Sequence, residues 1–180
     1  TEAMLEADLA TLLKLRMQQI TYYPLMVSTM TQRLMQETLG EVNFSREKSL
    51  FKQIIRKLEP FYDASSAWCF SRKKAAESLI DEYVVDFEEY AGLGSGAIGF
   101  LNGVCYANTF DIRHYIGSLE QNNLPLQAAR KFDLPDRMRY DFLMKLFSTK
   151  MNVNDLEKKY AGRYFKTLWK EMAAFTLAGS

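Results

Sequence analysis

The first residues of the chain place apolar side chains on one face of a helix and charged side chains on the other. This pattern predicts a helix over residues 2–16. The β-branched and aromatic run over residues 19–27 predicts a buried strand, in which Pro24 must lie near an end or a bulge. A helix that leads into a buried strand favours an α/β arrangement. The apolar stripe of the helix consists of Leu5, Leu9, Leu12 and Leu13.

A polar loop is expected next, followed by a second helix that begins after Asn43 and ends near Pro60. Residues 64–71 predict a short strand, and residues 83–87 alternate apolar with acidic side chains, as in a strand with one solvated face. The stripe of the second helix consists of Leu50, Ile54, Leu58 and Phe61.

Residues 104–107 have an extended pattern, and Asp111 is placed to open an amphipathic helix. Beyond residue 122 the pattern predicts helices only. Asp133 is a candidate cap for the first of them, and two more are expected around residues 155–160 and after Gly162. Three short helices with a tight turn resemble a winged-helix tail without its strand hairpin.

The charge balance, with 23 Lys and Arg against 22 Asp and Glu, argues against a nucleic-acid binder or a polybasic membrane anchor. No stretch is long and apolar enough for a membrane span, and residues 1–4 lack the pattern of a signal peptide, so we expect a cytoplasmic protein. Two distant cysteines, Cys69 and Cys105, and the single histidine His114 cannot form a Cys/His metal site alone.

Five glycines between residues 90 and 103 form the most informative stretch. The spacing of Gly94, Gly96 and Gly99 matches the dinucleotide-binding pattern G-x-G-x-x-G, but that pattern requires a following helix, which Gly103 would interrupt. Two other interpretations stay open. The glycines let a strand pass close to another backbone, or they let it approach a bound ligand.

The order of these features resembles the C-terminal part of oxygen-independent coproporphyrinogen III oxidase-like proteins, which are radical S-adenosylmethionine enzymes. The resemblance rests on the run from Tyr90 to Ile98, on Asn102-Gly103 and on Tyr106-Ala-Asn108 before the helix near Asp111. The segment Trp68-Cys69-Phe70-Ser71-Arg72 and the three-helix tail also fit, so the resemblance spans almost all of the chain.

The resemblance implies an α+β fold derived from an α/β one. Residues 1–122 would be the closing strands and helices of a partial (β/α) barrel, and residues 123–180 a small helical, winged-helix-like domain. It also implies S-adenosylmethionine and a [4Fe-4S] cluster for the full-length protein. The Cys-x-x-x-Cys-x-x-Cys motif of the family is absent from this chain, so we expect the fragment alone to hold neither cofactor and to be inactive.

Residue by residue, the resemblance implies that seven positions approach the cofactor. Ile98 would be an apolar contact to the adenosyl group, and the missing N-terminal half of the barrel would supply the cluster. The implied cofactor-binding residues are Tyr23, Pro24, Gly92, Gly94, Gly96, Ala97 and Ile98.

The substrate implied is a tetrapyrrole, either a porphyrinogen or haem. Ile98 stands where many relatives have a histidine, and Trp68-Cys69 also departs from the usual residues, which leaves the reaction open and favours a haem-utilisation branch. The alternative is a haem-binding or haem-transfer module without turnover. A winged-helix nucleic-acid module is a third hypothesis, opposed by the neutral charge.

Other residues have a functional and a structural interpretation. Cys69 and Cys105 could ligate haem iron but are more often small buried residues, and His114 is expected near the surface of its helix. Arg72, Lys73, Lys74 and Arg113 could pair with propionates or mark a solvated strand end. Asp86, Glu88 and Glu89 are expected on a solvent face. The aromatic residues that could line a flat pocket, or simply form core, are Tyr22, Tyr23, Trp68, Phe70, Phe100 and Tyr106.

Missing strands would leave an open sheet edge. We therefore expect a homodimer through that edge.

Overall fold

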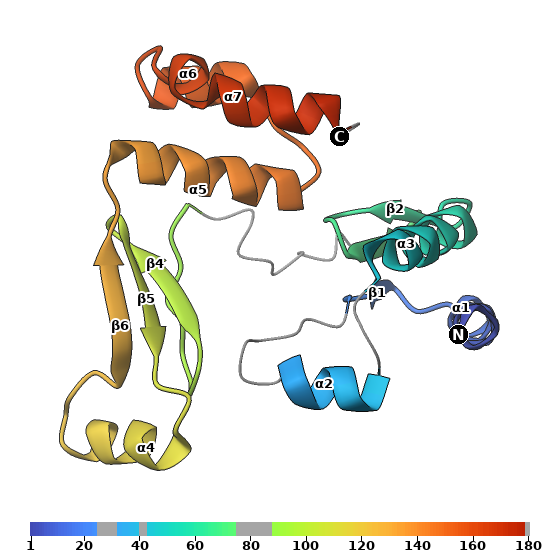
Figure 1. The fold of residues 1–180 in the computed structure, drawn as a ribbon, viewed down its shortest axis with the longest axis horizontal. Coiled ribbons are helices and arrows are strands. Elements are labelled where there is room, and N and C mark those ends of the chain that lie inside the picture. The colour runs from blue at the N-terminus through green and yellow to red at the C-terminus, as the bar shows by residue number, and fades with distance from the viewer. Residues whose placement is uncertain (25–31, 40–42, 75–87, 179–180) are drawn as a thin grey trace. The chain divides into compact units, whose positions relative to one another are not determined.

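The computed structural model describes residues 1–24, 32–39, 43–74 and 88–178 (Figure 1). The chain divides into two compact units, residues 1–81 and residues 82–180. Each unit has an apolar core and a three-stranded antiparallel sheet. The mixed content of helices and strands agrees with the expected class.

Two helices of the first unit confirm the sequence prediction. Helix α1 (Glu2–Leu15) begins at the cap residue Thr1 and ends at Arg16, whose φ of 53° lies in the left-handed region. Helix α3 (Phe44–Leu58) begins at Asn43, whose side chain accepts a hydrogen bond from the amide of Arg46 at 2.9 Å.

The polar loop expected between these helices contains a further helix, α2 (Gln32–Leu39), so that expectation is wrong. Arg33 and Glu37 form an i,i+4 ion pair at 2.9 Å on this helix. The segment is rich in strong helix formers, and these residues favour the helix.

The sheet of the first unit consists of β1 (Gln19–Thr21), β2 (Tyr62–Ala64) and β3 (Cys69–Arg72), in the order β1-β3-β2. The predicted strand over residues 19–27 is thus only three residues long within its described part, and residues 25–27 lie outside the described residues. The parallel arrangement expected for an α/β region is wrong for these strands, because β3 runs antiparallel to both neighbours.

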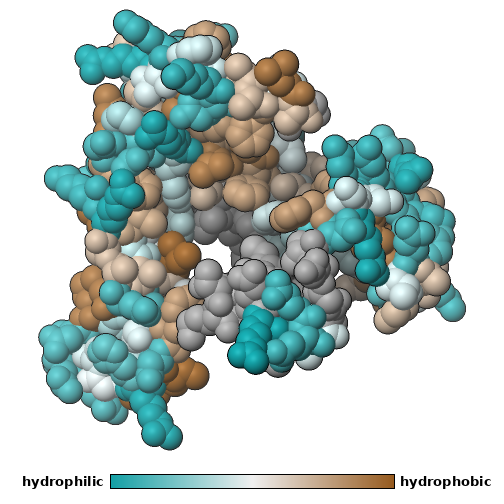
Figure 2. Space-filling view, viewed as in Figure 1, coloured by the Kyte–Doolittle hydropathy of each residue, from teal (hydrophilic) through white to brown (hydrophobic). Residues whose placement is uncertain are grey.

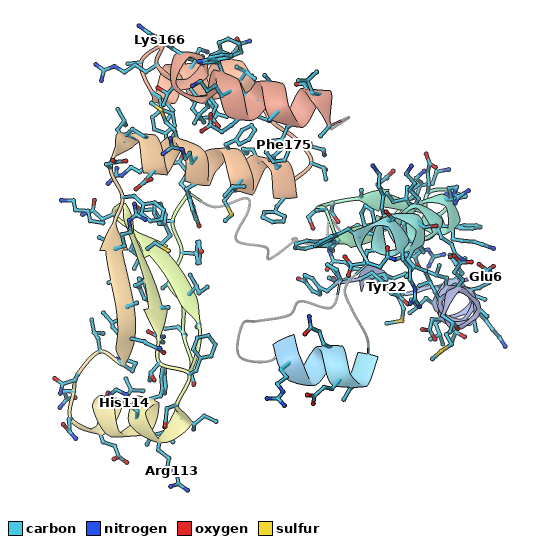
Figure 3. The ribbon with its side chains drawn as sticks, in the orientation of Figure 1. Glu6, Tyr22, Arg113, His114, Lys166 and Phe175 are labelled. Carbon is cyan, nitrogen blue, oxygen red and sulfur yellow. The ribbon has the colours of Figure 1, made fainter. Side chains whose placement is uncertain are left out.

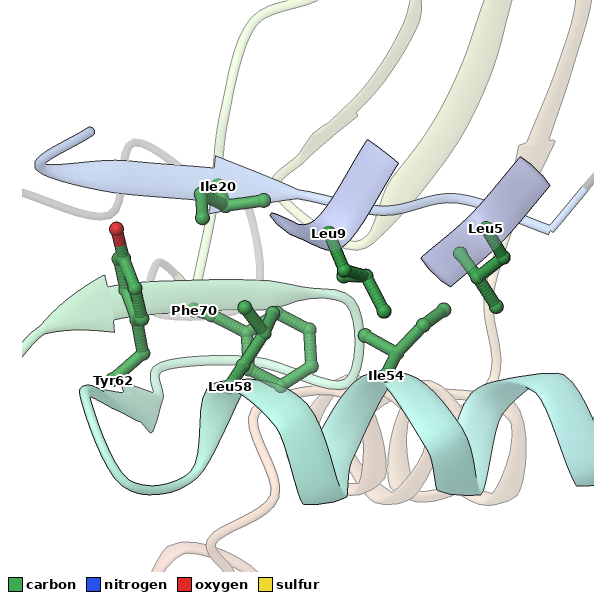
Figure 4. Close-up of a cluster of buried hydrophobic side chains, with 7 residues drawn as sticks. All are labelled: Leu5, Leu9, Ile20, Ile54, Leu58, Tyr62 and Phe70. Atoms are coloured by element: carbon green, nitrogen blue, oxygen red, sulfur yellow. The ribbon is translucent and has the colours of Figure 1, made fainter. Parts of the chain in front are cut away.

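One face of this sheet is covered by α1 and α3. Figure 4 shows Leu5 and Leu9 of α1 meeting the apolar side chains of α3, beside residues from all three strands. Phe61, predicted on the stripe of α3, lies after the helix and is largely exposed. The buried core consists of Leu5, Leu9, Ile20, Ile54, Leu58, Tyr62 and Phe70.

The sheet of the second unit consists of β4 (Ile98–Leu101), β5 (Val104–Asn108) and β6 (Leu126–Lys131), in that order. Asn102 and Gly103, with φ of 47° and 71°, form the two-residue turn between β4 and β5. Helix α4 (Ile112–Glu120) lies at one end of the sheet and α5 (Leu134–Phe147) at the other (Figure 1).

Strand β6 contradicts the prediction that only helices follow residue 122. All six of its residues are exposed, so it lacks the alternation by which strands are recognised. It is held by backbone pairing with β5 instead. This pairing crosses the predicted boundary at 122/123, which does not coincide with the compact units and stays a prediction about the barrel and its tail. The strand predicted over 83–87 lies outside the described residues.

The three predicted C-terminal helices are present as α5, α6 (Val153–Lys159) and α7 (Tyr164–Leu177). Asp133 caps α5 as expected, accepting a hydrogen bond from the amide of Asp136 at 2.8 Å. Their shared core consists of Met138, Phe142, Leu156, Tyr160, Tyr164 and Leu168. Within the described part of the chain, no helix combines the length and the apolar character that a membrane crossing requires.

Candidate functional site

The glycine loop, residues 92–97, leads directly into β4 at the α4 end of the second sheet. Gly94 and Gly96 have φ of 105° and 72°, which side chains rarely adopt. Because a strand and not a helix contains Gly99, the loop cannot present a helix N-terminus to a pyrophosphate. The dinucleotide-binding interpretation of Gly94, Gly96 and Gly99 is therefore wrong.

Asn108 stabilises the conformation of the glycine loop through hydrogen bonds. Its buried side-chain amide donates hydrogen bonds to the carbonyl oxygens of Gly92 and Gly94, at 3.1 and 3.0 Å. Its backbone amide donates to the carbonyl of Ala97 at 2.9 Å. One residue at the end of β5 thus fixes three points of the loop.

The amides of the loop glycines are also satisfied internally. Those of Gly92 and Gly94 donate to the hydroxyl oxygens of Tyr106 and Tyr115, each at 3.0 Å. The amide of Gly96 donates to the carbonyl of Thr109 at 2.9 Å. These three amides are therefore engaged by the protein and are not presented to an anionic ligand.

The close-packing interpretation of the glycines holds at Gly92 and Gly99, whereas ligand approach stays a prediction. A Cβ at Gly92 would lie 2.3 Å from the carbonyl oxygen of Ile98, and one at Gly99 would lie 2.2 Å from the ring of Tyr106. These glycines serve close packing. A Cβ at Gly94, in contrast, would have no atom within 4 Å.

Two residues in and next to the glycine loop expose apolar side chains. Leu93 is 86% exposed and Ile98 is 55% exposed. Apolar patches interrupt the polar surface around the sheet and α4 in Figure 2. Loop and side chains together can offer van der Waals contact to an apolar or aromatic group.

Tyr23 and Pro24, the other residues implied to contact the cofactor, follow β1 in the first unit and are both exposed. The ring of Tyr23 lies 5.5 Å from that of Trp68, centroid to centroid. Their contact with a cofactor stays a prediction.

The structural interpretation holds for Cys69, which is 1% exposed and receives a weak hydrogen bond from the hydroxyl of Thr21 at 3.6 Å. Cys105 is half-buried, and the loss of solvation raises the pKa of its thiol. His114 is exposed on α4, and neighbouring Arg113 points away from the sheet (Figure 3). None of these features favours a haem-iron ligand.

Four of the remaining candidates have structural partners in the described chain. Lys73 donates to the carbonyl of Glu59 at 2.7 Å, and Arg72 donates to the carbonyl of Arg16 at 3.3 Å. Glu88 pairs with Lys159 at 3.0 Å, and Glu89 accepts a hydrogen bond from the amide of Asn102 at 2.7 Å.

Both glutamates are exposed, as expected, and each also has one partner among the described residues. Asp86 lies outside the described residues. Lys74 is exposed.

The aromatic candidates are divided between the two units. Phe70 and Phe100 are buried core residues, whereas Tyr106 holds the glycine loop. Phe100 stacks on Tyr140 at 4.3 Å between ring centroids. Burial raises the pKa of Tyr140, whose hydroxyl donates to that of Tyr90 at 3.0 Å.

Sequence reasoning quoted Tyr106 and Asn108 as part of a family pattern but missed their role as supports of the loop. The signal was present, because residues 106 and 108 of one strand face the same side.

Among residues 1–24, 32–39, 43–74 and 88–178, no group of three or more Cys, His, Asp or Glu side chains could hold a metal ion. Cys69 and Cys105 also belong to different compact units. The described residues therefore do not fit an iron–sulfur cluster.

Neither a scan against protein-family models nor a search of curated proteins finds a match for this chain. Its structure is similar to that of coproporphyrinogen III oxidase (HemN) from Escherichia coli, described as a radical SAM enzyme, with a TM-score of 0.66 and 13% sequence identity. The similarity covers 97% of this chain and 45% of that enzyme's chain. It confirms, at the level of the fold, the resemblance seen in the sequence.

Proposed function

We propose that this chain is part of a radical S-adenosylmethionine oxidoreductase that acts on a porphyrinogen or haem. The observation that carries the proposal is the similarity to the radical SAM enzyme HemN over 97% of the chain. The chain spans less than half of that enzyme's length, so the activity of a whole enzyme is proposed only for a longer polypeptide.

In this proposal the glycine loop faces the adenosyl part of S-adenosylmethionine, which supplies hydrogen-abstraction chemistry when bound. Gly94 leaves the backbone open to a ligand, and Ile98 offers an exposed apolar side chain beside it. The amides of Gly92, Gly94 and Gly96 are already satisfied, so the loop contributes shape and apolar contact. Tyr23 and Pro24 are proposed as further contacts.

The described residues cannot hold the [4Fe-4S] cluster, so the proposal places its ligands elsewhere in the longer polypeptide. The role of this chain is then to bind and orient the cofactor and the tetrapyrrole. On its own we expect it to be inactive. Membership of a haem-utilisation branch and a cytoplasmic location remain part of the proposal.

The test uses the polypeptide as its gene encodes it, reconstituted anaerobically with iron and sulfide. Replacing Ile98 with Asp should weaken S-adenosylmethionine binding about tenfold or more, because an apolar contact is replaced by a solvated charge. Leu101→Asp is the matched control, since Leu101 lies on the same strand and is 41% exposed. Calorimetry gives the affinity, and chromatography gives porphyrinogen consumption.

If the two variants bind S-adenosylmethionine with equal affinity, Ile98 is not a cofactor contact. A polypeptide that takes up no cluster, leaves S-adenosylmethionine intact and shows a saturable Soret shift with haem would replace the enzyme with the haem-transfer module.

The homodimer expected from the sequence is also proposed, with β6 as the contact. Strand β6 is at the edge of its sheet, and all its side chains are exposed. Phe132 donates to the carbonyl of Gly103, so the alternating pattern turns the amide of Ala129 toward the open edge. A second copy of β6 could pair there.

A further inference from the structure

A pocket of about 350 Å³ opens on the first unit, and none of the residues proposed as cofactor contacts lines it. It lies where the end of α1 meets β2 and β3. The residues that line it are Leu13, Arg16, Phe61, Tyr62 and Arg72.

Two arginines line this pocket, and no Asp or Glu is among its lining residues. Within the described residues, neither Arg16 nor Arg72 forms an ion pair. Asp63, the acidic residue of β2, pairs instead with Lys73 at 3.6 Å. Like charges that line one pocket repel each other, and an anion between them relieves the repulsion.

One hydrogen bond positions the guanidinium of Arg72, and its other N–H donors stay free. Its Nη1 donates to the carbonyl of Arg16 at 3.3 Å, where α1 ends. A guanidinium carries five N–H donors in a fixed plane, so one such bond leaves a fork that can bind a carboxylate. The side chain of Arg16 has no hydrogen bond among those found in the described residues.

The other walls of the pocket are apolar. Phe61 is a large aromatic residue, yet it is 55% exposed. Tyr62 also lines the pocket but is a buried core residue, and its hydroxyl donates to the carbonyl of Met17 at 2.8 Å. Leu13 completes this side.

The pocket is distinct from the predicted cofactor contacts. The amide of Arg72 donates to the carbonyl of Gln18, just before β1 begins. The amide of Tyr22 donates to the carbonyl of Trp68, just after β1 ends. Tyr23 and Pro24 therefore lie toward the opposite end of the small sheet.

We infer that this pocket is a binding site for an organic carboxylate with a flat apolar body. The carboxylate binds between Arg16 and Arg72, and the apolar body lies against Phe61 and Leu13. The inference does not depend on the proposed radical chemistry.

The probe is 1-pyrenebutyrate, and its methyl ester serves as the uncharged analogue with the same ring system. Fluorescence anisotropy of the full chain should show saturable binding of the acid and binding at least about tenfold weaker for the ester, because a charge-assisted hydrogen bond is lost. Arg16→Gln should weaken the acid by a similar factor. Lys52→Gln removes an exposed positive charge on α3 and should leave binding unchanged.

Arg72→Gln should also abolish binding, but it removes the hydrogen bond to the end of α1, so thermal unfolding must accompany it. Arg16→Gln keeps the inference testable if that variant does not fold. Equal binding of acid and ester, or an equal loss in Lys52→Gln, would overturn the inference. Displacement of the probe by equimolar inorganic phosphate would also overturn it, because the site would then select a small anion.

Discussion

The two sheets of the molecule each have three antiparallel strands, yet they are stabilised differently. The first is covered by two helices whose leucines meet its apolar side chains. At its α4 end, the second is held by hydrogen bonds to the glycine loop, in which Asn108 donates and Tyr106 and Tyr115 accept.

At its other end, aromatic contacts of Phe100 and a hydrogen bond from Arg137 to the carbonyl of Asn102 join the second sheet to α5. A layer of apolar contacts distributes stability over many residues, whereas a hydrogen-bonded loop depends on a few specific ones.

The largest effect is expected in the apolar layer. Leu58→Ala should lower the free energy of unfolding by about 3 kcal/mol, because Leu58 is fully buried and its removal leaves a cavity. Ile55→Ala on the same helix is the control, since Ile55 is 37% exposed and should lose less than about half as much. Urea unfolding measures both. Equal losses would mean that the core of the first unit is not where it is described.

Asn108→Ala should lower the free energy of unfolding by about 2 kcal/mol, because two loop carbonyls lose their donor. Hydrogen exchange of the loop amides should accelerate in this variant while the amides of α1 keep their rates. Asn123→Ala, an exposed asparagine in the turn after α4, serves as the comparison and should change neither quantity. Unchanged exchange in the loop would contradict its dependence on Asn108.

Gly92→Ala should destabilise the protein by about 2 kcal/mol and Gly94→Ala by about 1 kcal/mol. At Gly92 the new methyl group would collide with backbone, whereas at Gly94 only the φ of 105° opposes it. Thermal unfolding of the two variants gives the order. The reverse order would show that the backbone conformation at Gly94 matters more than the close approach at Gly92.

The smallest effect on stability is expected at the open edge of the second sheet. Ala129→Pro should change the free energy of unfolding by less than about 1 kcal/mol, because proline is tolerated on edge strands. It should nevertheless convert the proposed dimer into a monomer, since it removes an outward amide. Light scattering at high concentration measures this, with Ala129→Ser as the control. If the wild-type protein is a monomer in this measurement, the proposed homodimer is wrong.

The helices were the most predictable part of the fold. Leu5 and Leu9 repeat with the period of one helical face, and Asn43 and Asp133 are side chains that cap helix starts. Helix α2 and strand β6 escaped prediction. Helix α2 lies in a stretch that was interpreted as a polar loop, and β6 is a strand without a buried face.

The sequence predicted where the glycine loop lies along the chain, but not the contacts that stabilise the loop. The spacing of the glycines pointed to residues 92–98, and the family resemblance pointed to the same positions. Neither showed that Gly92 is needed for packing while Gly94 is open, since that distinction depends on where Ile98 lies.

Local physical chemistry in the sequence determined where most helices begin, which of their faces are apolar and where glycines leave the backbone without side chains. The tertiary structure alone decided the strand pairings, the support of the loop by residues 106–115 and the meeting of Arg16 with Arg72 in one pocket. Helix signals act over three or four residues, whereas the pocket joins residues 56 positions apart. Such contacts exist only once the chain has folded.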